Sequence, residues 1–459
     1  MSTLATTFDD EESYHMAGMS LQDGIDQAGS PMRLFWNPDA APWRPPVLPP
    51  EFVGWREEQL AGHQSVALSD LSHHMWDTFV EGPDAVRLLS DITANNYQDF
   101  AVGQAKQMIA VTEQGHMVSD GILARTGENK FTLTSLGSGT NWVRYHAEVG
   151  NYDVSVHIDP DSHTRGGPDP VLFRYQIQGP HAQEVVAKVF GAPLPKVKFF
   201  HSTPVALGGR NFRALRHGMT GQPGYEFIGD WADAEYVKQA MLAAGESFGI
   251  TQVGADAYGT LALPSGWVPC TIPAIYTQPE LADYRKRVAL YSYEGQHRFF
   301  GSYFSENMED YYVTPYELGY AKSISFNHDF IGRDALIALQ DNVTRKKVTV
   351  VIAPDDGALI CGDDMKFMLT NGTYRVEADG EIIGIARYTG TYVPSGTILA
   401  LTLIDEKYAT PGTEVTFVWG SHPGPGHDPE ADTGFTRVRA TVQPAPYDDY
   451  ARCSYRKND

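Results

Sequence analysis

Residues 175–186 read YQIQGPHAQEVV, and residues 78–89 read TFVEGPDAVRLL. Each stretch begins with a short strand-like run, passes through Gly-Pro and continues with apolar residues at helical spacing. Proline is well tolerated in the first turn of a helix, so each stretch predicts a strand, a tight turn and a helix. Two related strand–helix units favour an internally duplicated α+β domain. Gly-Pro helix starts are common, so a chance match is the competing interpretation.

The N-terminal part of the chain, residues 1–50, is expected to lie outside the duplicated domain. Residues 1–30 are polar and acidic without apolar periodicity, which predicts a mobile arm. Residues 31–50 are rich in proline, which fixes the backbone without donating ladder hydrogen bonds, and predict an extended strap. The strap either packs on the surface or roofs a ligand pocket with its aromatic side chains.

The pattern changes near residue 346. Residues 51–345 mix strands, turns and helices, with one helix expected near residues 232–248. Residues 346–459 carry short alternating strands, namely KKVTVVIAP, TILALTLID, TEVTFVW and RVRATVQP. Such strands are typical of a small barrel. The predicted fold class is α+β, a duplicated α+β region with a C-terminal β-barrel.

Composition argues against several classes of function. The formal net charge is −22 and no long Lys/Arg run occurs, so nucleic-acid binding is not expected. No apolar stretch is long enough to span a membrane, and the N-terminus does not resemble a secretory signal. Three widely spaced cysteines, Cys270, Cys361 and Cys453, fit a reducing, cytoplasmic compartment.

Common catalytic and cofactor motifs are absent from the sequence. No P-loop, GxSxG or HExxH motif occurs, and residues 137–142 lack the third glycine of a dinucleotide fingerprint. The loop from His422 to Asp432 resembles a set of metal ligands, but its glycines and prolines favour a solvated hairpin loop. We therefore predict no metal site, and expect either no cofactor or a diffusible cosubstrate.

Two segments carry candidate catalytic groups. Adjacent residues on a strand face opposite ways, so only one of His73 and His74 can face a given pocket. Asp120 stands beside a glycine before an apolar strand, and a buried carboxylate needs donors that an amine-bearing ligand can supply. The competing interpretations are a histidine pair outside any site and a turn aspartate bonded to its own backbone.

The stretch from Leu215 to Phe227, LRHGMTGQPGYEF, is the most informative for binding. Its glycines and proline predict a tight loop that delivers Glu226 into a strand. A carboxylate can accept two parallel N–H bonds from a flat nitrogen heterocycle, such as a pterin or an amidine. A strand glutamate without such a role usually faces solvent.

In their order along the chain, these segments resemble the folate-binding family of the glycine cleavage system T protein, an aminomethyltransferase. The resemblance implies a duplicated α+β folate-binding region over residues 51–345, with the barrel after it. It also implies tetrahydrofolate as cosubstrate. The matching pieces are Asp70-Leu-Ser-His73, Ser119-Asp120-Gly121, Gly224-Tyr225-Glu226-Phe227, Thr314-Pro315-Tyr316-Glu317-Leu318-Gly319 and Phe330-Ile331-Gly332-Arg333-Asp334-Ala335-Leu336.

A closer resemblance is to the tetrahydrofolate-dependent O-demethylases of vanillate and syringate breakdown, a broad group that includes dicamba demethylase. The T protein has an arginine at the position of Tyr258, where the vanillate-type enzymes also have a tyrosine. This difference implies an aryl ether as the donor in place of an aminomethyl group. The matching segments are SHHM (72–75), LRHGM (215–219), SGWVP (265–269), IPAIYT (272–277) and MEDYYVTPYE (308–317).

The resemblance implies methyl transfer from a methoxylated aromatic acid to N5 of tetrahydrofolate, giving a phenol and 5-methyltetrahydrofolate. Tyr258 is expected to donate a proton or a hydrogen bond to the leaving oxygen, because its ordinary pKa is close to that of a phenol. His74 is expected to hold the substrate and Asp120 to lie near N5. The other expected site residues are Glu226, Tyr225, Trp267 and Arg216 for folate, and Trp43, Leu136 and Trp142 for the aromatic substrate.

The sequence departs from the vanillate-type pattern at the substrate. An arginine expected to grip the substrate carboxylate is missing from residues 135–140, and Trp43 aligns with a family tyrosine. These departures favour a related methoxyarene, for example a chlorinated one of the dicamba type, since Leu136 is apolar. The missing arginine implies either a different anion grip, with Arg33, Arg44, Arg125 and Arg144 as candidates, or a substrate of another shape.

Three alternatives remain at this stage. An aminomethyltransferase of another amine pathway would form methylenetetrahydrofolate, and a sulfonium demethylase of the dimethylsulfoniopropionate type would release no phenol. A folate-binding accessory protein of iron–sulfur assembly would carry a Lys-Gly-Cys-Tyr motif, which this sequence lacks. The expected partners are a small aromatic substrate and tetrahydrofolate, and the oligomeric state, monomer or homodimer, stays open.

Overall fold

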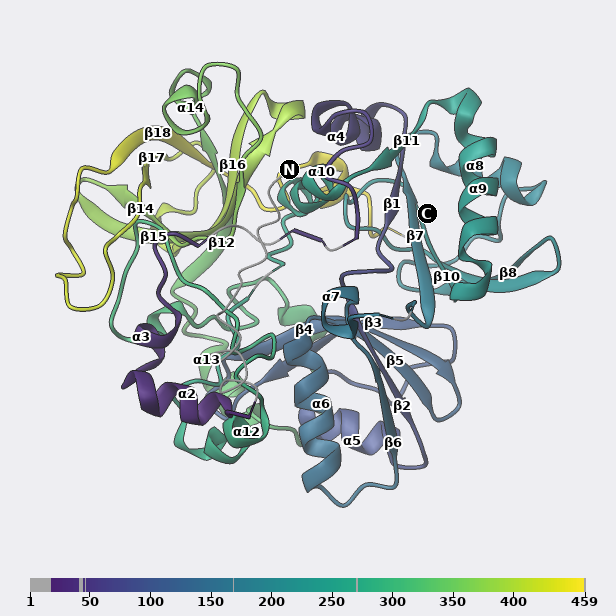
Figure 1. The fold of residues 1–459 in the computed structure, drawn as a ribbon, viewed down its shortest axis with the longest axis horizontal. Coiled ribbons are helices and arrows are strands. Elements are labelled where there is room, and N and C mark those ends of the chain that lie inside the picture. The colour runs from purple at the N-terminus through teal and green to yellow at the C-terminus, as the bar shows by residue number, and fades with distance from the viewer. Residues whose placement is uncertain (1–17, 41–43, 46, 168, 270, 458–459) are drawn as a thin grey trace.

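The computed structural model describes residues 18–40, 44–45, 47–167, 169–269 and 271–457. Trp43 and Cys270, together with the first 17 residues of the expected arm, lie outside the described residues. Figure 1 shows three bodies around the centre of the molecule, two helix-covered sheets and a β-rich body drawn in green and yellow.

The first sheet has five strands in the order β3-β4-β5-β2-β6, and its neighbours are antiparallel. Helices α5 and α6 pack on one face, where Leu88, Leu133 and Trp142 are fully buried. The bounds are β2 (Trp76–Glu81), α5 (Ala85–Ile92), β3 (Ala105–Val111), β4 (Met117–Gly127), β5 (Lys130–Ser135), α6 (Gly137–Val149) and β6 (Ser155–Asp159).

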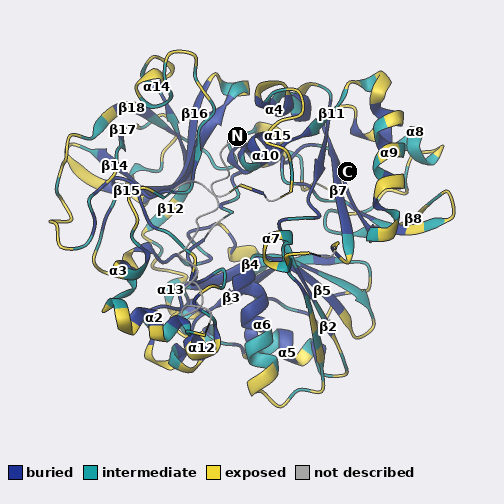
Figure 2. Ribbon diagram, viewed as in Figure 1, coloured by how far each residue is buried: buried dark blue, intermediate teal, exposed yellow. Residues whose placement is uncertain are grey.

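The second sheet has six strands in the order β11-β1-β7-β10-β9-β8. Strands β1 and β11 are parallel, whereas the other neighbours are antiparallel. Helices α8 and α9 cover its outer face, and their outward sides are exposed (Figure 2). The bounds are β1 (Val66–Asp70), β7 (Leu172–Gln178), α8 (Ala182–Phe190), β8 (Ser202–Leu207), β9 (Arg210–Leu215), β10 (Gly224–Asp230), α9 (Ala234–Gly245) and β11 (Ile250–Val253).

The predicted duplication is confirmed, because the two Gly-Pro stretches form equivalent units in the two sheets. Strand β2 leads through Gly82 into α5, and β7 leads through Gly179 into α8. The φ angles of these glycines are 145° and 140°. A Cβ atom would lie 2.3 Å from the Asp153 carbonyl oxygen at Gly82 and 2.5 Å from the Ser65 carbonyl oxygen at Gly179, so only glycine fits.

The C-terminal body is the predicted barrel. The strand order is β13-β15-β14-β17-β18-β12-β16, and the pairing of β15 with β16 closes it. Branched apolar side chains such as Val350, Ile398 and Val442 fill its interior. The bounds are β12 (Arg345–Ile352), β13 (Leu369–Thr370), β14 (Tyr374–Ala378), β15 (Glu381–Tyr392), β16 (Thr397–Asp405), β17 (Glu414–Trp419) and β18 (Thr436–Gln443).

The loop between β17 and β18 is held by its own histidine. His422 is fully buried, its Nδ1 accepts a hydrogen bond from the Gly424 amide at 2.9 Å, and its Nε2 lies 2.9 Å from the Asp428 carbonyl oxygen. The expectation of a solvated loop therefore holds for its exposed remainder but is wrong for His422. Among the residues described, no group of three His, Cys, Asp or Glu side chains is arranged to hold a metal ion.

The expectation of a mobile arm is wrong for its described part. Residues Leu21–Ala28 form helix α2, which Ser20 and Asp23 cap reciprocally, and Leu21 is fully buried against the core. The polar composition misled because a short amphipathic helix needs few apolar residues to pack. The other helices are α3 (Pro31–Phe35), α4 (Trp55–Gln64), α7 (Ser162–Arg165), α10 (Ala255–Thr260), α11 (Ala262–Ser265), α12 (Ala282–Arg287), α13 (Arg333–Leu339), α14 (Pro354–Cys361) and α15 (Asp449–Cys453).

Short 3-10 helices join several of these elements. They are η1 (Trp231–Asp233), η2 (Glu246–Phe248), η3 (Pro279–Leu281), η4 (Met308–Tyr311), η5 (Ala321–Ser323), η6 (Val393–Ser395) and η7 (Glu406–Tyr408). In the part of the chain that the structure describes, no helix combines the length and the apolar character needed to cross a membrane.

Candidate active site

Two adjoining cavities lie between the three bodies. The first, of about 140 Å³, is lined by side chains of both sheets and of the C-terminal segment. The second, of about 430 Å³, also touches barrel residues. Met75, Leu136, Met219, Tyr258 and Trp267 line both cavities, so the two share a wall.

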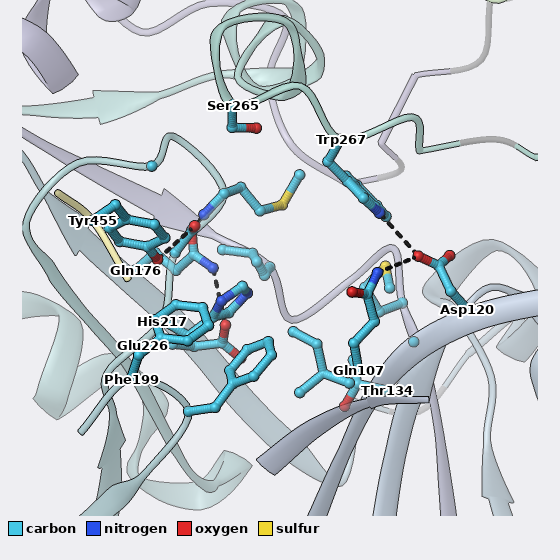
Figure 3. A pocket seen from close by; sticks show the side chains of 18 of the residues that line it. Gln107, Asp120, Thr134, Gln176, Phe199, His217, Glu226, Ser265, Trp267 and Tyr455 are labelled. Carbon is cyan, nitrogen blue, oxygen red and sulfur yellow. Dashed lines mark hydrogen bonds between the residues drawn. The ribbon is translucent and has the colours of Figure 1, made fainter. Parts of the chain in front are cut away.

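Asp120 provides a buried carboxylate at the first cavity. It lies in β4, and its Oδ2 accepts hydrogen bonds from Gln107 Nε2 at 2.9 Å and Trp267 Nε1 at 3.2 Å (Figure 3). The Tyr320 hydroxyl donates to the same oxygen at 3.0 Å. Burial raises the pKa of Asp120, although these three donors oppose the rise. Its Oδ1 has no hydrogen bond within the described residues and is available as an acceptor.

Glu226 lies on the opposite side of the first cavity (Figure 3). It stands in β10 across from Gln176 of β7, whose Nε2 donates to Oε2 at 2.9 Å. Arg174 Nη1 donates to Oε1 at 3.0 Å, while Arg174 Nη2 donates to Asp77 at 2.7 Å. Burial, the largest single influence, raises the pKa of Glu226, but the charges of Arg174 and His217 and the hydrogen bonds from Gln176 and Arg174 together outweigh burial and lower it. The carboxylate is therefore ionised, and its remaining lone pairs can accept further hydrogen bonds.

The loop before β10 is held close to β7 by glycine, as its sequence predicted. Gly224 has φ 151°, and a Cβ atom there would lie 1.9 Å from the Ile177 carbonyl oxygen. This approach is open only to glycine, and it brings His217 and Met219 to the cavity wall.

His74 and Tyr258 meet because β1 and β11 are parallel neighbours. The carboxyl ends of parallel strands share one edge of a sheet, and His74 follows β1 while Tyr258 follows β11 in α10. The Tyr258 hydroxyl lies 2.6 Å from His74 Nε2 and 2.8 Å from Met219 Sδ. Both residues are buried and line the second cavity.

The pKa values of this pair are shifted in opposite directions. Burial lowers the pKa of His74 to about 4, so its ring is neutral near pH 7. Burial, and then the negative charge of Glu226, raise the pKa of Tyr258 well above its ordinary value. The two groups therefore share a hydrogen bond between neutral partners, whose donor depends on the His74 tautomer.

The structure brings Leu136 and Trp267 to the shared wall but not every expected site residue. Trp142 is fully buried in the core of the first sheet, where its Nε1 donates to the Ile92 carbonyl oxygen at 3.1 Å. Helical periodicity cannot distinguish such a core tryptophan from one that faces a ligand. Trp43 lies outside the residues that the structure describes, so that expectation stays a prediction.

Tyr225 and Arg216 also lie away from both cavities. Tyr225 precedes Glu226 in β10 and so faces the opposite side of the sheet, in the core under α8 and α9. Arg216 donates to the carbonyl oxygens of Val197 and Lys457 at 3.2 and 2.6 Å. Neither residue is among those that line a cavity.

Sequence reasoning missed several lining residues. Tyr455 and Arg456, from the C-terminal segment, line the first cavity. Tyr293, His297 and Arg298 line the second. No local pattern marks either segment, because both reach the cavities through long-range packing. The four arginines considered for gripping an anion are absent from the described lining of these two cavities, namely Arg33, Arg44, Arg125 and Arg144.

Comparisons with known proteins agree with this architecture. Residues 37–270 match the family model described as GCVT N-terminal domain. The chain is 35% identical over 450 residues to a syringate O-demethylase of Sphingobium sp. (strain NBRC 103272 / SYK-6), covering 95% of this chain and 97% of that protein. It is 27% identical over 432 residues to a sesamin methylene transferase of Sinomonas sp. (strain No.22), covering 88% and 90%.

A solved structure shares the fold. The crystal structure of the glycine cleavage system aminomethyltransferase T of Bartonella henselae superposes with a TM-score of 0.61 at 20% sequence identity, covering 88% of this chain and 92% of that chain. The chain therefore belongs to the GCVT family, and the resemblance seen in its sequence is confirmed. It is an enzyme, a methyltransferase that uses tetrahydrofolate as cosubstrate.

The first cavity suits that cosubstrate. Two carboxylates, Asp120 and Glu226, can accept N–H bonds of a flat heterocycle, and the unbonded Oδ1 of Asp120 leaves room for one. Phe199 and Trp267 offer aromatic faces in the same lining.

Proposed function

We propose that the protein is a tetrahydrofolate-dependent O-demethylase of methoxylated aromatic acids. The observation that carries the proposal is that Tyr258, in the wall shared by the two cavities, contacts His74, which lines the second cavity. A phenol hydroxyl between a folate site and a larger, partly apolar cavity suits an aryl ether whose oxygen must leave as methyl is transferred. The 35% identity to a protein named syringate O-demethylase supports the same reaction.

The reaction breaks one O–CH3 bond and forms one N–CH3 bond. When bound, tetrahydrofolate supplies N5, the nucleophile that takes the methyl group. The electron pair of the broken bond stays on the aryl oxygen, and the Tyr258 hydroxyl stabilises that oxygen as a hydrogen-bond donor. Because burial raises the pKa of Tyr258 well above its ordinary value, the residue keeps its proton and acts as a donor without becoming a phenolate.

His74 orients this donor. A neutral imidazole 2.6 Å from the Tyr258 oxygen holds the ring in place and, in the tautomer that donates from Nε2, turns the phenol proton toward the cavity. In the same proposal Asp120 accepts a proton or hydrogen bond from the folate nitrogen, while Glu226 and Trp267 hold the heterocycle. Leu136 contacts the substrate at the shared wall.

The parts of the chain take distinct roles in this proposal. Residues 51–345 bind folate and substrate, residues 346–459 comprise the barrel and a C-terminal segment that returns to the first cavity, and residues 1–50 precede both, with helices α2 and α3 in their described part. We also propose a cytoplasmic location, supported by widely spaced cysteines that fit a reducing compartment. Cell fractionation tests the location.

The function is tested by incubating the protein with tetrahydrofolate and a panel of methyl ethers that includes syringate, vanillate and dicamba. The expected products are the phenol and 5-methyltetrahydrofolate in equal amounts. Glycine-type amines and dimethylsulfoniopropionate, added in parallel, are expected to give no product. Formation of methylenetetrahydrofolate, or turnover of the sulfonium alone, would overturn the proposal.

A further inference from the structure

One wall of the second cavity is formed by a segment that sequence analysis did not select. Residues 291–298 read YSYEGQHR, and Tyr293, Gln296, His297 and Arg298 from it all line the cavity. Glu294, in the middle, is fully buried and is held by Asn141 Nδ2 at 2.8 Å. The buried Glu294 thus holds the segment in place, and its neighbouring polar side chains line the cavity.

Arg298 carries a charge without a partner of opposite sign. It is half-buried, and among the residues the structure describes no carboxylate oxygen lies within 4.0 Å of its nitrogen atoms. Its Nη1 donates to the backbone oxygens of His297 at 2.7 Å and Gly295 at 3.3 Å, and its Nη2 reaches Gln296 Oε1 at 3.5 Å. These contacts fix the guanidinium, while Nε and the rest of Nη2 stay open to a further acceptor.

The surroundings of Arg298 do not compensate this charge. Burial lowers the pKa of Arg298, as expected for a cation that has lost water without gaining an anion. Asp161, the carboxylate in the described lining of the same cavity, already accepts from Trp76 Nε1 at 3.0 Å and from the Thr164 amide at 2.7 Å. Arg298 is therefore a guanidinium on the cavity wall that makes no ion pair within the described residues.

We infer that Arg298 is the residue that binds the carboxylate of the aromatic substrate in the second cavity. A planar guanidinium binds a carboxylate through two parallel hydrogen bonds, and a fixed guanidinium loses little entropy on doing so. The apolar walls formed by Leu136, Phe300 and Leu369 suit the aromatic ring. This inference rests on the proposed function and specifies its substrate class, an aromatic acid. Arg298 would take the place of the carboxylate-binding arginine that is missing from residues 135–140.

The test measures binding without turnover, so that it does not depend on the demethylation reaction. The probes are 4-hydroxy-3,5-dimethylbenzoate, which has no ether to cleave, and its uncharged carboxamide. The wild-type protein is expected to bind the carboxylate about 10- to 100-fold more tightly than the carboxamide, since hydrogen bonds to charged groups dominate the difference. Equal binding of the two probes by the wild-type protein overturns the inference.

Arg298→Gln is expected to remove this preference and to leave carboxamide binding within about twofold of the wild type. Arg287→Gln is the matched control, because Arg287 is exposed, lies in the last turn of α12 and lines neither cavity. An unchanged preference in Arg298→Gln overturns the inference. If that variant does not fold, Arg298→Lys replaces it, with a reduced but measurable preference expected and an unchanged one counting against the inference.

The same variants separate this inference from the proposed function. If the wild-type protein demethylates aryl ethers but the preference does not depend on Arg298, the function stands and the carboxylate site is elsewhere. If the preference depends on Arg298 but no aryl ether is demethylated, the site stands and the reaction is wrong.

Discussion

The hydroxyl of Tyr258 lies 2.6 Å from His74 Nε2, in the wall between the first cavity, which we propose binds folate and call the folate cavity, and the larger second cavity. If this hydroxyl stabilises the leaving oxygen, Tyr258→Phe lowers kcat by about 10²- to 10³-fold, the usual effect of removing one such donor. Tetrahydrofolate binding should stay within about twofold, because the ring that lines the folate cavity is kept. Steady-state kinetics and calorimetry measure the two effects.

Tyr97→Phe is the control for this substitution. Tyr97 is also buried and hydrogen bonded, to Thr93 at 2.8 Å, but it lies in the core and lines neither cavity. Its variant is expected to keep kcat. Full turnover in Tyr258→Phe would rule out the hydroxyl as the donor.

His74 makes folding stability depend on pH. Its pKa is about 4 in the folded chain against 6.5 ordinarily, so between pH 6.5 and 4 the unfolded chain binds a proton that the folded chain does not. The stabilisation is complete above pH 6.5 and is lost as the pH falls toward 4, by up to about 3 kcal/mol for this group. His74→Asn should therefore flatten the decline of the unfolding free energy over this window.

Urea unfolding at several pH values measures that slope. His181→Asn is the control for the substitution itself, since His181 is an exposed histidine at the start of α8, away from both cavities. Equal slopes in the wild type and in His74→Asn would show that His74 titrates normally when folded.

At the scale of elements, β10 delivers Glu226 only because the preceding loop can approach β7. Gly224→Ala places a Cβ atom 1.9 Å from the Ile177 carbonyl oxygen, and we expect the free energy of unfolding to fall by about 2 kcal/mol or more. Because Glu226 is two residues further on, tetrahydrofolate binding should weaken as well. Chemical denaturation and calorimetry test both effects.

Gly209→Ala separates the steric clash from backbone strain. Gly209 also has a positive φ, 82°, in the turn between β8 and β9, but no atom lies within 4 Å of a Cβ built there. Only strain of about 1 kcal/mol is expected, with folate binding kept. Equal losses in the two variants would remove the close approach to β7 as the cause.

At the scale of the whole molecule, the C-terminal segment closes the folate cavity from outside the two sheets. The Tyr455 hydroxyl donates to the Gly218 carbonyl oxygen at 2.9 Å, and its ring meets Phe199 edge-on with centroids 5.2 Å apart. Replacing both Tyr455 and Arg456 by alanine should weaken tetrahydrofolate binding about tenfold, because an aromatic contact and a hydrogen bond are lost.

The control for this double variant is Tyr450→Ala, since Tyr450 is an exposed tyrosine in the adjoining α15 and lines neither cavity. Its folate binding is expected to match the wild type. Unchanged binding in the double variant would mean that the C-terminal segment contacts the cavity without contributing to it.

The local sequence was sufficient to predict those helices and strands in which buried apolar residues recur at regular spacing. The two Gly-Pro units and strands β12, β16, β17 and β18 were predicted, because a half-buried strand or helix repeats its apolar residues with a fixed period. Strand β15 was missed. Its sequence, EIIGIARYTGTY, is interrupted by Gly384 and by the buried Arg387, whose Nη2 bonds the Tyr311 carbonyl oxygen at 2.6 Å.

The same limit applies to the site. Asp120, Glu226, His74, Tyr258 and Trp267 were predicted because each stands in a short stretch typical of its family, and all five line at least one of the two cavities, while their roles stay predictions. Tyr225 and Trp142 were expected at the site but lie in the core. The spacing of apolar residues indicates that a side chain is buried, but it does not indicate whether the side chain packs against the core or a ligand. The direction of a side chain depends on which sheet face the ligand occupies.

Only the tertiary structure decided how the site is assembled. The sequence by itself determined the duplicated fold, because its strands and helices follow from local periodicity and its turns depend on glycine. The contacts of His74 with Tyr258 and of Tyr455 with Gly218 join segments far apart in the chain, and Arg298 lines a cavity with residues from distant segments. Their meeting depends on the parallel pairing of β1 with β11 and on the packing of three bodies, which no local pattern encodes.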